Sequence, residues 1–416
     1  MSETAPLEEP LAYHAAVRDY LQREEPEVWQ WYALNRVRAE HAEANRFELL
    51  KKTYRVDRGS QSDLYRIADE VAGRVAPGVA VTVYHAQQPA GLNASLAYLP
   101  GEAHVVLHGP VAEKLNEAEL RALFAHELGH VMLYERWEGE LLIASQVLSA
   151  MTHDRRAAAA HFATARLFDL YTEVFCDRVA LRVIGDPHDV VSMLVKISTG
   201  LDRVDPEGYL KQAEEILGRS PAAASEGLTH PEAYLRAHVL KLWQEQPAEA
   251  AQRLAELIEG QPPLDELDFI AQQRLHAWTR SLLDAFFEPA WARTDLLLSH
   301  GRLFFDDYQP PPLASASPKS AASDSRLGAL QTPVAEAHAS VQDYCCYVLL
   351  DFASADRELE TAPLAHALDI AARLGLEKRM GEIAAKELRL RKKQLEQIAA
   401  DRERLIADAA KLGTSP

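Results

Sequence analysis

Five consecutive residues, His126-Glu127-Leu128-Gly129-His130, constrain the fold of this chain more than any other feature of its sequence. Histidines four positions apart lie on one face of a helix, so both imidazoles can bind one tetrahedral zinc ion. The carboxylate of Glu127 then lies where it can take a proton from a water on that ion. The pattern therefore predicts a helix that carries part of a hydrolytic zinc site.

The residues around this pattern also predict a helix. Asn116, followed three positions later by Glu119, has the spacing of a capping box, which begins a helix. A glycine such as Gly129 destabilises the interior of a helix by about 1 kcal/mol relative to alanine. We therefore expect another backbone or a metal to approach closely at this position. Apolar residues recur at helical spacing through the motif: Leu120, Leu123, Phe124, Leu128 and Val131.

Length and composition limit the class of protein. A chain of 416 residues, 48% of them hydrophobic, fits two or three globular domains. Its 44 basic and 62 acidic residues give a formal charge of -18, which argues against a nucleic-acid partner or an anionic membrane surface. Protein or peptide partners fit this charge better.

Three features predict a cytoplasmic protein. Cys176, Cys345 and Cys346 have neither paired nor metal-binding spacing, which favours a reducing compartment. The N-terminus is acidic and has no apolar signal core. The uncharged stretch 141–153 is shorter than the roughly 20 residues that span a bilayer, so we predict no integral membrane segment.

The distribution of helix and strand signals predicts an α+β fold in which helices dominate. Residues 1–60 have helical spacing, and a helix over 62–75 should end near Pro77-Gly78. Alternating valines at 79–83 and the apolar run 105–107 predict strands. Nearly every segment from 117 onward has helical spacing, including 161–184 and 231–246.

Two histidines need a third protein ligand, and Glu173 is the best candidate because its surroundings are apolar. Spacing alone leaves Asp154, Asp169 and His161 as alternatives, and Glu173 could instead pair with a basic residue or with solvent. Asp177, one helical turn beyond Glu173, could accept the second ring proton of a ligand histidine and fix its tautomer.

His230 precedes Pro231 at the expected start of a helix that carries Arg236. A histidine in a loop could donate a hydrogen bond to the oxyanion of a tetrahedral intermediate, or bind zinc as an added ligand when no substrate is present. An ordinary histidine at a helix start is the alternative that composition favours.

Three elements in order resemble the HtpX and CAAX-prenyl-protease-like zinc peptidases. The first runs from Asn93-Ala94 through Val105-Val106-Leu107-His108-Gly109 to the two histidines. The second is Glu173-Val174-Phe175-Cys176-Asp177, which is similar to the family's Glu-x-x-x-Asp element. The third is Thr229-His230-Pro231 followed by Arg236. The similarity covers about Tyr54–Trp243.

This resemblance implies one zinc ion held by His126, His130 and Glu173, with Glu127 as general base. It also implies that Asp177 supports the site and that His230 lies near the substrate oxyanion or the zinc. Many family members carry membrane helices, whereas none is evident here. Cys176 replaces the alanine that often precedes the family's Asp, which concerns local packing.

Residues 351–376 vaguely resemble TerB-like helical domains, although an acidic cluster at a helix start is more often solvated than metal-bound. We therefore predict four parts. The first two are a helical N-terminal lead-in (1–60) and a zincin-type metallopeptidase domain with a small edge-strand sheet and a helical extension (61–307). The last two are a flexible linker rich in Pro, Ser and Ala (308–333) and an all-α C-terminal domain (334–416) that contains a long charged helix over 377–412.

The predicted function is that of a soluble zinc endopeptidase. A substrate peptide could add to the edge strand near 98–107, with Asn93 as a contact to its backbone. Two alternatives remain: a zinc-stabilised adaptor that recruits partners through its C-terminal helices and cleaves little or nothing, and a zinc hydrolase that acts on something other than peptides.

Overall fold

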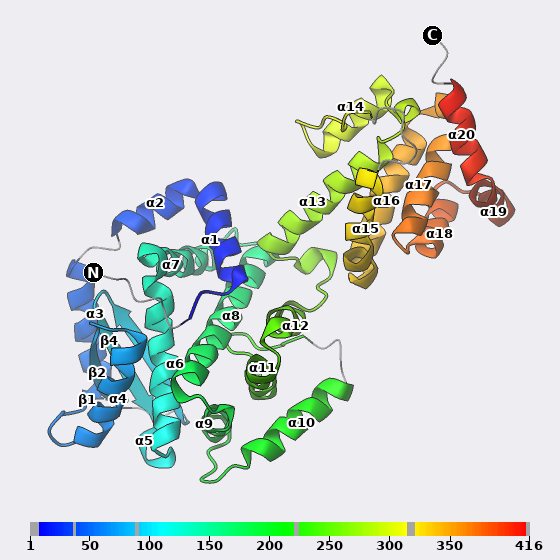
Figure 1. Ribbon diagram of the computed structural model, residues 1–416. Coiled ribbons are helices and arrows are strands. Elements are labelled where there is room, and N and C mark those ends of the chain that lie inside the picture. The colour runs from blue at the N-terminus through cyan, green and yellow to red at the C-terminus, as the bar shows by residue number, and fades with distance from the viewer. Residues whose placement is uncertain (1–7, 36–38, 88–90, 220–223, 314–320, 413–416) are drawn as a thin grey trace. The chain divides into compact units, whose positions relative to one another are not determined.

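The computed structural model describes residues 8–35, 39–87, 91–219, 224–313 and 321–412. Helices dominate this part of the chain, and its strands form one four-stranded sheet (Figure 1). The predicted α+β, helix-dominated fold is therefore confirmed. The chain divides into two compact units, Met1–Gly260 and Gln261–Pro416.

The first unit contains the sheet and the helices that surround it. Its strands are β1 (Thr53–Arg55), β2 (Ala80–Ala86), β3 (Asn93–Leu99) and β4 (Glu102–His108). Its helices are α1 (Ala12–Glu24), α2 (Pro26–Asn35), α3 (Ala39–Lys52), α4 (Ser62–Val75), α5 (Val111–Lys114), α6 (Glu117–Glu135), α7 (Glu140–His153), α8 (Ala159–Ile184), α9 (Pro187–Thr199), α10 (Pro206–Arg219), α11 (Ala233–Glu245) and α12 (Pro247–Glu259), with a 3₁₀ turn at Arg136–Gly139.

The sheet has the strand order β1-β2-β4-β3, in which β2 and β4 are parallel and both outer pairs are antiparallel. The β-branched residues that predicted two strands face each other in it, with Val83 opposite Val105. Because β4 pairs with both β2 and β3, the edge strands of the sheet are β1 and β3 (Asn93–Leu99), and the prediction that an edge strand extends to Leu107 is wrong. The sequence of β3, Asn-Ala-Ser-Leu-Ala-Tyr-Leu, has no β-branched residue to mark it.

Helix α6 begins at the predicted capping box. The Asn116 side chain accepts a hydrogen bond from the Glu119 amide at 3.0 Å, and Glu119 accepts one from the Asn116 amide at 2.8 Å. Glu119 is buried, and its charge is balanced by Lys196 of α9 at 2.8 Å, while Ser192 donates to it at 2.6 Å. This network fixes the start of α6, which packs along α8 and contacts β3 (Figure 1).

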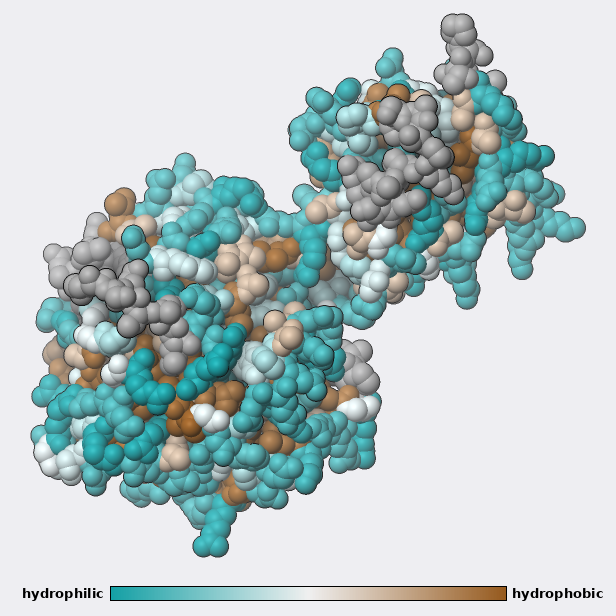
Figure 2. All heavy atoms as spheres, viewed as in Figure 1, coloured by the Kyte–Doolittle hydropathy of each residue, from teal (hydrophilic) through white to brown (hydrophobic). Residues whose placement is uncertain are grey.

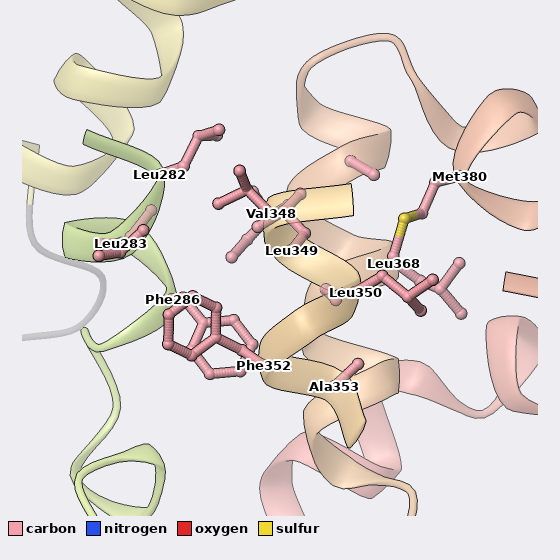
Figure 3. Packing of buried hydrophobic residues seen from close by; sticks show 14 of the residues in the cluster. Leu282, Leu283, Phe286, Val348, Leu349, Leu350, Phe352, Ala353, Leu368 and Met380 are labelled. Carbon is pink, nitrogen blue, oxygen red and sulfur yellow. The ribbon is translucent and has the colours of Figure 1, made fainter. Parts of the chain in front are cut away.

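The second unit is a helical bundle. Its helices are α13 (Phe269–Phe286), α14 (Asp295–Phe304), α15 (Ala321–Glu336), α16 (Ala339–Ala355), α17 (Ala362–Arg373), α18 (Glu377–Glu387), α19 (Lys392–Ala400) and α20 (Arg402–Leu412), with 3₁₀ turns at Leu264–Glu266, Ala290–Ala292 and Arg357–Leu359. Figure 3 shows its core, where Phe286 of α13 packs on Phe352 of α16 with ring centroids 5.1 Å apart.

The boundaries of this unit differ from the predicted domains. It begins near Gln261, so α13 and α14 belong to it and not to the first unit. The segment 308–333 is not a linker at its described ends: Tyr308 is buried, and α15 buries Leu327 and Leu330 in the core. Residues 314–320, in the middle of that segment, lie outside the described part of the chain.

The predicted long charged helix over 377–412 is instead three helices, α18, α19 and α20. Arg389 has a φ of 54°, which ends the first of them because an L-residue in that conformation cannot continue a right-handed helix. The breaks let the chain fold back, so that Leu388, Leu395 and Ile406 pack against the core. Burial of these side chains decides against the extended alternative.

The face of both units in Figure 2 is mostly hydrophilic, as expected for a globular protein. Among the residues that the structure describes, no helix combines the length and the hydropathy needed to cross a bilayer.

Candidate metal centre

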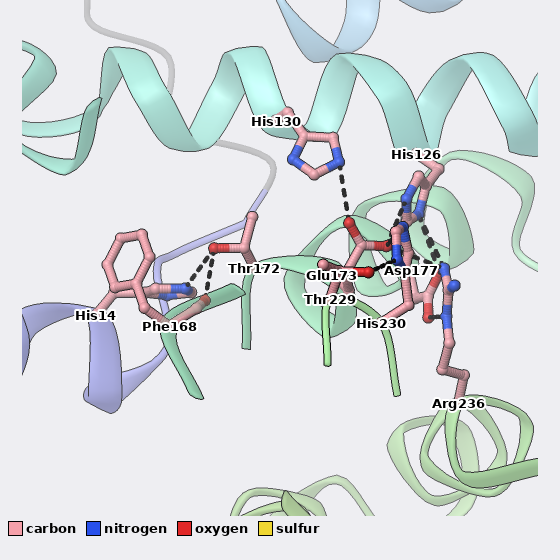
Figure 4. A network of polar contacts seen from close by, with 10 residues as sticks. All are labelled: His14, His126, His130, Phe168, Thr172, Glu173, Asp177, Thr229, His230 and Arg236. Atoms are coloured by element: carbon pink, nitrogen blue, oxygen red, sulfur yellow. Dashed lines mark hydrogen bonds and ion pairs between the residues drawn. The ribbon is translucent and has the colours of Figure 1, made fainter. Parts of the chain in front are cut away.

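Two helices bring three potential ligands together. His126 and His130 extend from α6 toward Glu173 of α8, and ligand atoms of all three lie within 4.8 Å of one another (Figure 4). The two imidazoles lie nearly perpendicular, with centroids 5.4 Å apart. His126 and Glu173 are buried and His130 is half-buried, so water competes little for these donors.

The facing atoms of this group require a positive charge between them. Nε2 of His126 lies 3.3 Å from Oε2 of Glu173, and Nε2 of His130 lies 3.5 Å from Oε1. Oε2 of Glu173 is buried and has no hydrogen-bond partner in the described part of the chain. A neutral imidazole that presents its lone pair to a carboxylate is repelled by it, so either a proton or a metal ion must lie between them. Two imidazoles and one carboxylate are the donors that a metal such as zinc accepts.

Asp177 contacts the ring nitrogen of His126 that does not face Glu173, and Arg236 in turn binds Asp177. Oδ1 of Asp177 lies 3.0 Å from Nδ1 of His126, and this contact keeps a proton on Nδ1, so that Nε2 is the nitrogen that faces Glu173. Arg236 of α11 binds Asp177 through two nitrogens, each at 2.6 Å, from the side away from α6 (Figure 4). Such a bidentate pair fixes the carboxylate in one orientation.

The pKa values reflect how strongly these groups are coupled. Burial alone would lower the pKa of His126, but its contacts with Asp177 and Glu173 raise it to about 10. Burial lowers the pKa of His130 to about 4. Glu173 has its pKa held well below its usual range by His126, His130 and Arg236, which overcome the effect of burial. The centre therefore keeps an ionised carboxylate in a buried position, which suits a cation.

Glu127 lies between the two histidines in the sequence of α6. Its side chain is buried, with 5% of the residue's surface exposed. Burial, followed by the negative charge of Glu173, raises its pKa to about 7, while His126 and Arg236 act in the opposite direction. A carboxylate with a pKa near neutrality can both accept and return a proton, as general acid–base catalysis requires.

His230 approaches the same carboxylate from the loop before α11. Its Nε2 lies 3.4 Å from Oε2 of Glu173, its Nδ1 contacts the Thr229 hydroxyl at 2.8 Å, and about half of its side chain is exposed. Arg166 of α8 fixes this loop by donating to the carbonyls of Gly227, at 2.8 Å, and Ser225. The loop thus carries an accessible imidazole to the edge of the candidate metal position.

The remaining predicted site residues lie elsewhere. Asn93 is exposed at the start of β3, where it pairs with His108, and its role as a substrate contact stays a prediction. Among the described residues, the group that can hold a metal includes Glu173 and none of the alternatives Asp154, His161 and Asp169. No local signal in the sequence marks Arg166, because no spacing rule relates it to a loop about 60 residues away.

Metal-dependent peptidases hold their ion on paired helices with donors of this kind, and the fold and the site together define this class. Residues 59–244 match the model of peptidase family M48. The resemblance inferred from the three motifs is thereby confirmed.

The chain is also similar to "Plastoglobule-localized metallopeptidase 48, chloroplastic" of Arabidopsis thaliana, with 30% identity over 205 residues. The similarity covers 45% of this chain and 58% of that protein, so the chain spans less than two thirds of its relative. No solved structure gives a significant match.

Proposed function

We propose that this metallopeptidase is a zinc endopeptidase in which His126, His130 and Glu173 hold one zinc ion and Glu127 is the general base. The observation that carries the proposal is the position of Glu173. Its two carboxylate oxygens face Nε2 of His126 and Nε2 of His130, and its buried Oε2 lacks a hydrogen-bond partner among the described residues. When bound, zinc would polarise the scissile carbonyl and acidify a water molecule.

Other residues of the site would transfer protons, orient a ligand and stabilise the oxyanion. Glu127 would take the proton of the attacking water and return it to the leaving amine, for which a pKa near neutrality is suited. Asp177, itself held by Arg236, would keep the proton of His126 on Nδ1. His230 would donate a hydrogen bond to the developing oxyanion, and its partial exposure leaves it free to turn toward a substrate.

A peptide substrate would add to β3, whose outer edge offers unpaired backbone groups in an extended conformation. Asn93 at its start would contact the substrate backbone. Protein or peptide substrates follow from the family. Partners bound through the second unit and a cytoplasmic location stay predictions, and the relative from Arabidopsis thaliana is named as a plastoglobule-localized protein.

The test compares the wild-type protein with Glu127→Gln. The variant should bind zinc in the same amount, measured by mass spectrometry of the metal, and should lose cleavage of casein by a factor of at least about 10³, as expected when a general base is removed. Glu113→Gln, at an exposed position on α5, is the control for loss of a negative charge.

Equal casein cleavage by the wild type and by Glu127→Gln would contradict this mechanism. A wild-type protein that binds zinc and cleaves nothing would favour the alternative of a zinc-stabilised adaptor. In that case X-ray absorption should find four protein ligands around the ion, because a structural site is closed.

A further inference from the structure

The contacts between α6 and α8 form a series of facing pairs that continues past the metal centre. His126 faces Asp177, and His130, one turn later on α6, faces Glu173, one turn earlier on α8. The helices therefore run antiparallel, and one further turn along each helix places Tyr134 of α6 opposite Asp169 of α8. The electrostatics agree, since burial and nearby negative groups, Asp169 among them, raise the pKa of Tyr134.

Asp169 differs from the other acidic residues of the site because it has no ion-pair partner among the residues that the structure describes. Asp177 is paired with Arg236, and Glu173 faces histidines, whereas no Lys, Arg or His in the described part of the chain pairs with Asp169. The residue is exposed, so its carboxylate is accessible to a ligand. Partial burial, and then the charge of Glu173, raise its pKa to about 6. Asp169 is therefore an accessible anion one helical turn from Glu173.

Two aromatic rings extend from this anion to the exposed strand. The Tyr134 ring lies 6.1 Å from the His130 ring and 6.0 Å from the ring of Tyr98 on β3. The Tyr98 hydroxyl donates to Glu135 at 3.1 Å, which fixes that ring beside Tyr134. A carboxylate and the faces of tyrosine rings attract the same kind of group, a long side chain that ends in a cation.

We propose that Asp169, with Tyr134 and Tyr98, forms a subsite that selects a lysine or arginine side chain of the peptide substrate. This inference rests on the proposed peptidase function. Asp169 is one helical turn from Glu173, about 6 Å, and an extended peptide advances about 3.3 Å per residue. The selected residue therefore lies within about two positions of the scissile bond.

The first experiment maps the cleavage sites of denatured casein by mass spectrometry. The wild-type enzyme should prefer Lys or Arg at one position near the cleaved bond, and Asp169→Asn should reduce that preference about tenfold, as expected for loss of a charge-assisted contact. Asp169→Lys should favour Glu or Asp at the same position. Asp63→Asn, an exposed position on α4, controls for the change in net charge and should leave the preference unchanged.

A binding measurement separates this proposal from the peptidase activity itself. A fluorescent peptide with central lysines and no arginine, and the same peptide with its lysines acetylated, are titrated against zinc-loaded Glu127→Gln. Acetylation removes the charge, so it should weaken binding about tenfold, and the difference should disappear in Glu127→Gln/Asp169→Asn.

If the wild type cleaves nothing while the charged peptide still binds better, the peptidase proposal fails and the subsite stands. Equal binding of the two peptides, or an unchanged cleavage preference in Asp169→Asn, overturns the subsite.

Discussion

Gly129 of α6 lies directly against Cys176 of α8. A Cβ atom added at Gly129 would be 3.1 Å from the Cα of Cys176 and 3.2 Å from both its Cβ and its Sγ. The close backbone approach expected from a glycine inside the motif is therefore present, and the neighbour is another helix. This contact sets how near α6 comes to α8, and so how near the histidines come to Glu173.

Replacing Gly129 by alanine should separate the two helices. Overpacking costs about 1–3 kcal/mol, while the better helix propensity of alanine returns about 1 kcal/mol, so we expect a net loss of about 1 kcal/mol and weaker zinc binding. Chemical denaturation and zinc titration measure both effects. Gly73→Ala on α4 is the control, because a Cβ there meets nothing within 4 Å and the substitution should stabilise. A fully stable Gly129→Ala variant with normal zinc affinity would show that the contact is not limiting.

Removal of the Asp177 carboxylate, which contacts Nδ1 of His126, should reduce both metal binding and stability. Asp177→Asn should reduce zinc affinity about 10- to 100-fold, measured by competition with a chromophoric chelator. It also leaves the buried Arg236 without its main partner, which should cost about 3 kcal/mol in urea denaturation. The exposed pair of Arg58 and Asp69 has similar bidentate geometry, so Asp69→Asn is the control and should cost less than about 1 kcal/mol.

Arg166 should control the loop that carries His230. Arg166→Ala removes the donors to the carbonyls of Ser225 and Gly227, so we expect faster hydrogen exchange over 225–230 and about a tenfold lower kcat. Zinc content should stay unchanged, because Arg166 contacts none of the three candidate ligands. Arg66→Ala, which breaks an exposed ion pair with Glu117, is the control. Normal kcat together with normal exchange in the loop would exclude a positioning role.

His14 should make the protein less stable in acid. Its Nδ1 accepts the Leu11 amide proton at 3.2 Å, its Nε2 contacts the Thr172 hydroxyl, and burial lowers its pKa to about 3. Because the folded pKa is below the unfolded value of 6.5, the unfolded chain binds the extra proton first. The stabilisation is complete above pH 6.5 and declines as the pH falls toward 3, by up to about 1.4 kcal/mol per pH unit.

Urea denaturation at about pH 7 and about pH 5.5 tests this dependence. His14→Gln should lose about 1 kcal/mol less than the wild type between these two conditions. His153→Gln, on the exposed end of α7, should behave like the wild type. Parallel losses in the wild type and in His14→Gln would assign the acid sensitivity to other groups.

Local sequence was enough to predict the elements that carry their own signals. The capping box at Asn116 and the apolar spacing beyond it predicted α6, and the structure has that box. The helix over 62–75 has the predicted bounds, because its apolar stripe and the following Pro77-Gly78 are local features. By contrast, α18, α19 and α20 replace one predicted helix, since only packing against the second unit's core shows where the chain must turn.

The sequence by itself predicted the class of protein, because two histidines and a glutamate at this spacing on a helix are typical of a metal-dependent hydrolase. The tertiary structure decided which acidic residue lies close to these two histidines. Spacing left Glu173, Asp169 and two other residues equivalent, and only the antiparallel packing of α6 on α8, at a distance set by Gly129 and Cys176, brings Glu173 to the histidines and leaves Asp169 one turn away. Helical periodicity fixes the face on which a side chain lies, whereas the register between two helices depends on contacts between residues far apart in sequence.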